Sequence, residues 1–151
     1  MPLLEASGGE VHQIVGDEVM AIFNKQGDTP DHPERASRAA LRLQEEAERI
    51  ASAHPKWPRF RTGVNSGDVV AAVVGGSRGH RKHGVVGDTV NLAARLEAAA
   101  RPGTVVIGEA TYRRLGVGAV AERVAPLQVK GRREPVDAYV LLALPAATDT
   151  A

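Results

Sequence analysis

The sequence predicts a single α+β domain, in which a largely antiparallel sheet is covered by helices on one face. Three observations support this fold class. The 151 residues suffice for one compact core but leave little room for a second. Short apolar stretches with strand-like character occur in pairs around Gly-containing turns, and these pairs are interleaved with stretches of helical periodicity.

The first quarter of the chain predicts a hairpin followed by a long helix. Residues 11–15 and 18–23 are rich in Val and Ile, and Gly16-Asp17 is expected to close them as a hairpin. Apolar residues then recur at helical spacing between Asp31, the expected N-cap, and Pro55, the expected stop. This helix has the clearest signals in the chain.

The rest of the chain predicts a second hairpin and then alternating helices and strands. Residues 59–76, RFRTGVNSGDVVAAVVGG, are expected to turn back at Ser66-Gly67, and the basic segment GGSRGHRKHG is interpreted as a loop between strands. A helix is expected from its cap at Asp88 to Pro102-Gly103. The remaining expected elements are a strand over 104–108, a short helix over 109–115, and strands around 119–130 and 135–143.

Composition excludes several function classes. Nineteen Lys and Arg against eighteen Asp and Glu give a net charge of +1, so no bulk field indicates a nucleic-acid partner or a membrane surface. The chain has no cysteine, which excludes disulfides and thiolate chemistry. No apolar run is long enough for a transmembrane segment, and no secretory signal is evident. A cytoplasmic location is therefore the expectation.

Three places in the sequence carry residue types suited to phosphate chemistry. Asp17, at a sharp turn, could bind a hard cation such as Mg²⁺, although Asp also favours turns for backbone reasons. Asn91 and Arg95 share a helix face and could contact a ribose oxygen and a phosphate, or could simply be solvated. Lys130, before a Gly turn, could meet a terminal phosphate or lie on a solvated hairpin tip.

The order and wording of four blocks resemble the class III adenylate/guanylate cyclase catalytic domain. The blocks are GGEVHQIVGDEVMAIF, RTGVNSGDVVAAVVGG, VVGDTVNLAARLEAAARPGTVVIGEATYRRL and VKGRREPVDAYVL, and together they run from about residue 8 to 143. GDTVNLAARLE followed by PGTVVI is the most specific part. The resemblance implies a palm-type, ferredoxin-like sheet, with residues 1–144 as a catalytic domain that lacks its first strand and helices and 145–151 as a tail.

The resemblance also implies a reaction and its residues. A family member converts ATP or GTP to the 3′,5′-cyclic nucleotide and pyrophosphate with two Mg²⁺ or Mn²⁺ ions, in cyclic-nucleotide signalling. Asp17 matches a metal-binding aspartate, Asn91 the ribose-orienting asparagine, Arg95 the arginine that stabilises the α-phosphate, and Lys130 the lysine that contacts the triphosphate. Sites form between two chains, so a nucleoside triphosphate and a second copy are the expected partners.

The sequence departs from the family pattern in two respects. The family's other metal aspartate lies on an upstream strand, which we do not find in these residues. The purine-selecting positions hold Gln13 and Gly84, neither of which matches the usual adenylate or guanylate pair, so weak discrimination with ATP preferred is expected. Two hypotheses stay open: a nucleotide cyclase, or a degenerate non-catalytic module that binds nucleotide or forms a heterodimer with a complete cyclase to regulate it.

Overall fold

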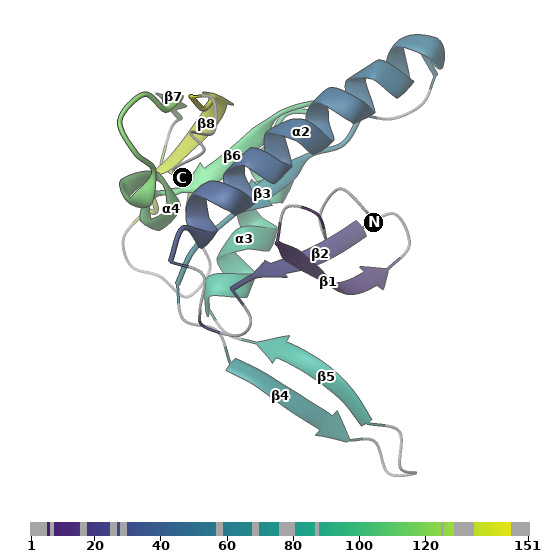
Figure 1. Cartoon of the computed structure of the whole chain (residues 1–151), viewed down its shortest axis with the longest axis vertical. Helices are drawn as coiled ribbons and strands as arrows, with labels where there is room; N and C mark the ends of the chain where they lie inside the picture. The colour runs from purple at the N-terminus through teal and green to yellow at the C-terminus, as the bar shows by residue number, and fades with distance from the viewer. Residues whose placement is uncertain are drawn as a thin grey trace.

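A four-stranded sheet lies at the centre of the computed structural model (Figure 1). Its strands follow the order β3 (Thr62–Val64), β6 (Val105–Gly108), β8 (Ala138–Ala143) and β7 (Val120–Arg123). β3 runs parallel to β6, and the other neighbours are antiparallel. The structure describes residues 6, 8–15, 18–24, 27, 30–56, 59–67, 70–75, 81–86, 88–124, 126–128 and 135–145, with the backbone alone for 12–15, 18, 70–75 and 81–86.

Two separate hairpins and three helices complete the described fold. β1 (Gly9–Val15) pairs with β2 (Glu18–Phe23), as the sequence predicted, and β4 (Val70–Gly75) pairs with β5 (Arg81–Val86). The helices are α2 (His32–Ala53), α3 (Asp88–Ala99) and α4 (Glu109–Arg114). None of them is long and apolar enough to cross a membrane.

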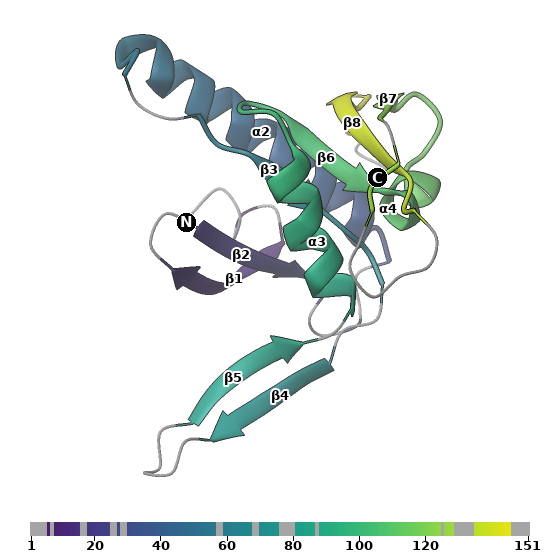
Figure 2. The ribbon, with the colours of Figure 1, turned by 180° about the vertical axis from the view of Figure 1, so that it is seen from behind.

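The long helices α2 and α3 pack on opposite faces of the central sheet (Figures 1 and 2). Successive residues of a strand point to opposite faces. Val105 and Ile107 pack with Ala40 of α2, whereas Val106 packs with Leu92 and Leu96 of α3. The α+β class with largely antiparallel sheets is confirmed. The helical cover lies on both faces instead of the one expected, because all of β6 is buried between two apolar clusters.

The predicted hairpin around Ser66-Gly67 is wrong. β3, which precedes this position, pairs with β6, while β4, which follows it, pairs with β5 from Val70 opposite Val86 to Gly75 opposite Arg81. Part of the segment interpreted as a loop therefore belongs to β5. Alternation along a strand shows which face is buried, but it does not show which strand lies alongside, and here the partner of β3 is distant in sequence.

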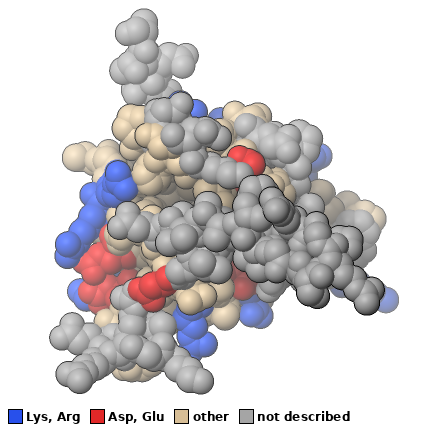
Figure 3. All heavy atoms as spheres, turned by 90° about the horizontal axis from the view of Figure 1, so that it is seen from below, with Lys and Arg blue, Asp and Glu red and all other residues tan. Residues whose placement is uncertain are grey.

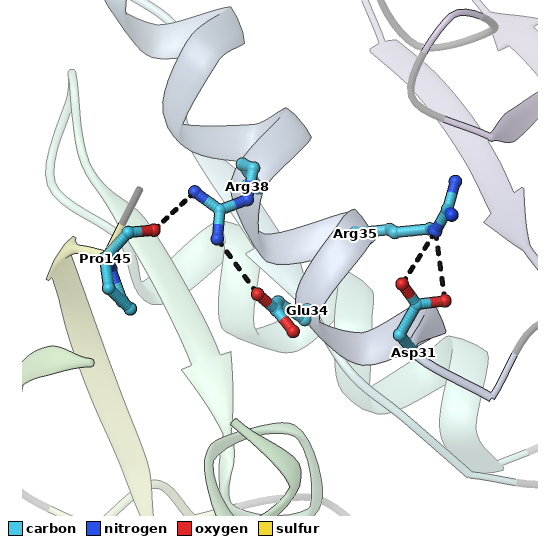
Figure 4. Close-up of polar contacts among 5 residues, drawn as sticks. All are labelled: Asp31, Glu34, Arg35, Arg38 and Pro145. Carbon is cyan, nitrogen blue, oxygen red and sulfur yellow. Dashed lines mark hydrogen bonds and ion pairs between the residues drawn. The ribbon is translucent and has the colours of Figure 1, made fainter. Parts of the chain in front are cut away.

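Helix α2 begins where the sequence predicted, but its first turn is stabilised differently. Asp31 is the N-cap residue, yet its side chain makes no capping hydrogen bond and instead accepts from Arg35 Nε at 3.0 Å (Figure 4). Arg38 donates to Glu34 Oε1 at 2.9 Å and to the Pro145 carbonyl oxygen at 2.7 Å. The second contact ties α2 to the segment that follows β8.

Strand β3 is held between both long helices. From α2, the buried Gln44 side chain donates through Nε2 to Thr62 Oγ1 at 2.7 Å. On the other face, α3 lies so close that a Cβ added at Gly63 would overlap the Ala93 carbonyl oxygen and the Glu97 amide nitrogen. Both of those atoms belong to the helix backbone, which cannot rotate away as a side chain could. Glycine is therefore required at position 63 to seat α3.

We predict that Gly63→Ala lowers the free energy of unfolding by at least about 2 kcal/mol, because the methyl group forces α3 away from β3. Urea denaturation followed by circular dichroism measures the change. Gly116→Ala is the matched control, since an added Cβ there has no neighbour within 4 Å and the backbone φ is not positive. It should be neutral or slightly stabilising. Equal changes in the free energy of unfolding for the two variants would contradict the close packing of α3 on β3.

The start of α2 also contacts the end of α4. Arg114 Nη1 lies 3.3 Å from His32 Nε2. Because a guanidinium can only donate, Nε2 must accept, which requires the neutral imidazole. Burial lowers the pKa of His32 below its ordinary value of 6.5, the charge of Arg114 lowers it further, and Asp31 opposes both effects.

This lowered pKa predicts a pH-dependent stability. The contribution of neutral His32 is fully present above pH 6.5 and is lost as the pH falls below that value, because the unfolded chain then binds the proton more readily. His32→Gln keeps an acceptor for Arg114 without titrating. Unfolding free energies measured from pH 7.5 to 5 should therefore fall more steeply for the wild type than for the variant, by less than about 1 kcal/mol at this exposed contact. Parallel profiles would refute the assignment.

Candidate functional site

Helix α3 presents a polar pair to solvent beside its buried stripe. Leu92 and Leu96 are buried against the central sheet, whereas Asn91 and Arg95, each one residue earlier, are exposed. Residues four apart lie on one face of a helix, so Asn91 and Arg95 are neighbours on a surface whose orientation the two leucines fix. Among the described residues, no hydrogen bond or ion pair engages either side chain. The predicted placement of the pair on one helix face is confirmed.

The loop after β3 holds the first turn of α3. Asn65 Nδ2 donates to the Thr89 carbonyl oxygen at 3.1 Å. The next residue, Ser66, shares a hydrogen bond of 2.8 Å between its Oγ and Oγ1 of Thr111, a fully buried residue of α4. The sequence predicted a turn at Ser66-Gly67 and indicated no role for Asn65. Asp88, predicted as the N-cap, is the first residue of α3.

A hollow of about 410 Å³ opens beside this loop. Two of its carboxylates are paired with arginines: Glu109 with Arg113 at 2.8 Å and Asp137 with Arg123 at 2.8 Å. The hydrogen bond from Arg123 holds the pKa of Asp137 below its ordinary value. This hollow could not be predicted from local sequence patterns, because its walls come from separate elements. The lining residues are Asn65, Ser66, Asp88, Thr89, Leu92, Glu109, Ala110, Pro135, Val136 and Asp137.

The two predicted purine-selecting residues lie on strands and not on α3. Gln13 is on β1, directly after an irregularity that leaves one extra residue between the pairs Val11–Ala21 and Gln13–Met20. Such bulges re-aim side chains locally. Gly84 is on β5 opposite Ala72. Asp17 and Lys130 lie outside the described residues, so their roles stay predictions.

Charged side chains are dispersed on the face seen in Figure 3. On the face shown in Figure 3, Lys and Arg side chains form separate groups, and acidic side chains lie beside some of them. Within the described part of the chain, no group of three or more His, Cys, Asp or Glu side chains could hold a metal ion. The metal-binding carboxylate predicted from the sequence, Asp17, lies outside the described residues.

Comparison with known families gives a match along nearly the whole chain. Residues 3–143 match the model of the adenylate and guanylate cyclase catalytic domain. Adenylate cyclase 1 of Rhizobium meliloti is 31% identical over 98% of this chain and 23% of its own length. Soluble guanylate cyclase 89Da of Drosophila melanogaster is 33% identical over 86% of this chain and 19% of its own. The chain thus spans about a quarter or less of these two relatives.

Solved structures with the same fold include nucleotide-bound and dimeric proteins. The guanylate cyclase domain of RhGC from Catenaria anguillulae, in complex with GTP, superposes with a TM-score of 0.84 at 28% identity, over 95% of this chain and 77% of that one. A non-canonical dimeric guanylyl cyclase domain of the RhoGC fusion protein from Blastocladiella emersonii superposes with a TM-score of 0.74 at 25% identity, over 93% of this chain and 75% of that one.

Proposed function

The chain belongs to the adenylate and guanylate cyclase catalytic domain family, and on that premise we propose that it converts a purine nucleoside triphosphate to the 3′,5′-cyclic nucleotide and pyrophosphate. The observation that carries the proposal is the exposed Asn91–Arg95 pair on the firmly seated helix α3. An asparagine and an arginine on one helix face can contact a ribose and a phosphate together.

The proposed reaction is an intramolecular displacement. The ribose 3′-hydroxyl loses its proton and attacks the α-phosphorus, a new P–O bond closes the ring, and the bond to the β-phosphate breaks to release pyrophosphate. Asn91 would hold the ribose so that the 3′-oxygen faces the phosphorus. Arg95 would stabilise the charge that develops on the α-phosphate oxygens. Lys130 would act as a point charge on the terminal phosphates.

A divalent ion is part of this proposal. Asp17 would supply one carboxylate oxygen to Mg²⁺ or Mn²⁺, and phosphate oxygens of the nucleotide would complete most of the remaining coordination. Such an ion, when bound, lowers the energy of the negative charge that accumulates on the phosphates during displacement. One protein carboxylate is a sparse donor set, so metal affinity should be low and Mn²⁺ should support turnover better than Mg²⁺.

We further propose that the active form is a C₂ homodimer. In it, Asp17 of one chain would face Asn91 and Arg95 of the other, which gives two equivalent sites. The β4–β5 hairpin supports this arrangement because it projects away from the central sheet as an arm (Figure 1). A guanylyl cyclase domain with the same fold forms a non-canonical dimer, which supports pairing of such domains but not this particular arrangement.

The direct test is a cyclization assay with ATP and GTP in Mg²⁺ and in Mn²⁺. It is run on this chain and on an N-terminally extended form, because a further metal carboxylate would raise turnover in the longer form. Cyclic nucleotide and pyrophosphate should appear in equal amounts. Absence of turnover in both forms, with nucleotide still bound, would favour the non-catalytic alternative.

Arg95→Ala should lower kcat at least about a hundredfold, which corresponds to about 2.7 kcal/mol of barrier, because it removes charge stabilisation that is needed mainly in the transition state. Nucleotide affinity, measured by calorimetry, should change little. Arg101→Ala, which removes another exposed arginine just beyond α3, is the control and should keep wild-type turnover.

The Arg95→Ala variant also tests whether each site is shared between two chains. Mixing Arg95→Ala chains with Asp17→Ala chains should restore about a quarter of wild-type activity, since half of the dimers would be mixed and each mixed dimer would hold one intact site. Full activity of Arg95→Ala would overturn the transition-state role. Failure of the mixture to recover, with both variants inactive and dimeric, would overturn the shared site.

Purine selection should be weak. Gln13 can both donate and accept through its amide, and Gly84 has no side chain to add a second contact. We predict that kcat/KM with Mn²⁺ favours ATP over GTP by less than a hundredfold. Gln13→Glu removes the donor and should shift the ratio several-fold toward GTP, whose base edge offers two neighbouring N–H groups. A strong ATP preference that Gln13→Glu leaves unchanged would place selection elsewhere.

A further inference from the structure

We infer that Asn65 is a positioning residue for the proposed cyclization, because it fixes the first turn of α3 and with it the place of Asn91. The inference rests on the proposed function for the part that Asn91 takes in the reaction. Asn65 itself lies in the loop after β3, and it would act through the helix backbone without contacting the nucleotide.

One side of the Asn65 amide holds α3. Its Nδ2 donates to the Thr89 carbonyl oxygen at 3.1 Å, two residues before Asn91. In a helix this carbonyl also accepts from the amide of Ala93, and a carbonyl oxygen has two lone pairs. The side-chain contact therefore adds to the helical hydrogen bonding at the end where a helix most readily frays.

The other side of the same amide lies over β6. Val64 pairs with Ile107 in the parallel register, so Asn65 and Gly108 follow at the same level. A Cβ added at Gly108 would lie 2.5 Å from Asn65 Oδ1, which places this oxygen directly over the glycine. The amide thus lies between a buried strand and the first turn of α3. This strand is the most deeply buried in the described sheet, so on its β6 side the amide is packed against the interior of the domain.

The neighbouring Ser66 provides a matched comparison. It belongs to the same loop and has similar exposure, but its Oγ forms its hydrogen bond with Thr111 of α4 and not with α3. If the loop stabilised the domain only in a general way, removing either side chain would have the same consequences. If instead Asn65 specifically stabilises the first turn of α3, only its removal should speed amide exchange in the helix that carries Asn91.

The test compares Asn65→Ala, Asn65→Asp and Ser66→Ala in the full chain. Steady-state cyclization with Mn²⁺ gives kcat and KM, and hydrogen exchange read by NMR gives protection of the amides of residues 92–95. We expect Asn65→Ala to lower kcat about tenfold with KM within about twofold, since a small displacement of a reacting group costs rate more than binding. Exchange of the four amides should be about tenfold faster. Ser66→Ala should leave kcat and these amides unchanged.

Asn65→Asp adds a pH signature that general destabilisation would not produce. It keeps the side-chain shape but places a carboxylate oxygen against the Thr89 carbonyl oxygen at neutral pH. When protonated, the new carboxyl can donate to that oxygen again. Glu109 and Asp137 line the adjacent hollow but are paired with Arg113 and Arg123. The pKa of the new group is therefore raised mainly by the Thr89 carbonyl oxygen, to which only the protonated form can donate. Its kcat relative to wild type should therefore rise several-fold as the pH falls from 8 to 6.

The outcomes separate this inference from the proposed function. If Asn65→Ala changes neither kcat nor amide exchange, the positioning role is overturned. It is also overturned if Asn65→Ala speeds exchange but leaves kcat unchanged while Arg95→Ala is inactive. If Arg95→Ala keeps full turnover, or no form turns over, the proposed function fails and the positioning role falls with it. In that case the exchange data still show whether Asn65 holds the helix. If kcat of Asn65→Asp relative to wild type stays constant from pH 8 to 6, the hydrogen bond to Thr89 is not the cause of the effect on kcat.

Discussion

The contact between the backbones of β3 and α3 at Gly63 is the constraint on which the rest of the described site depends. A side chain at this position would collide with main-chain atoms of the helix, so the distance between the two elements is set by backbone packing. Leu92 and Leu96 then fix the rotation of α3 about its axis, because both are buried against β6 and β8. Once position and rotation are fixed, the directions in which Asn91 and Arg95 project are determined as well. The site residues thus owe their placement to residues that have no chemistry of their own.

Local sequence patterns were sufficient for the elements whose partners are adjacent in the chain. The β1–β2 hairpin follows from two apolar runs around one turn, and α2 follows from its periodicity between Asp31 and Pro55. The parallel pairing of β3 with β6 could not be predicted in this way, because it joins segments separated by a hairpin and a helix. The Asn-Ser-Gly sequence after β3 is typical of a tight turn, and only the fold shows that Asn65 contacts α3 instead.

The candidate site was predictable to a similar degree and for similar reasons. Helical spacing and the family resemblance together located Asn91 and Arg95, and both lie exposed on α3. The bulge before Gln13 had no signal in the sequence, since it is a property of the pairing between two strands. The hollow near Asn65 gathers side chains from several elements, which only the assembled fold brings together. The roles of Asp17 and Lys130 stay predictions.

Several arginines of the described chain pair with acidic residues, whereas Arg95 does not. Arg35, Arg38 and Arg113 each pair with an acid four residues earlier on the same helix, and Arg38 also binds a backbone carbonyl. Exposed pairs of this kind contribute at most a few tenths of a kcal/mol each, so they bias local structure without fixing it. Arg95 has no such partner among the described residues. Binding a phosphate there would break no ion pair with another described residue, so the guanidinium would exchange only its water for the phosphate oxygens.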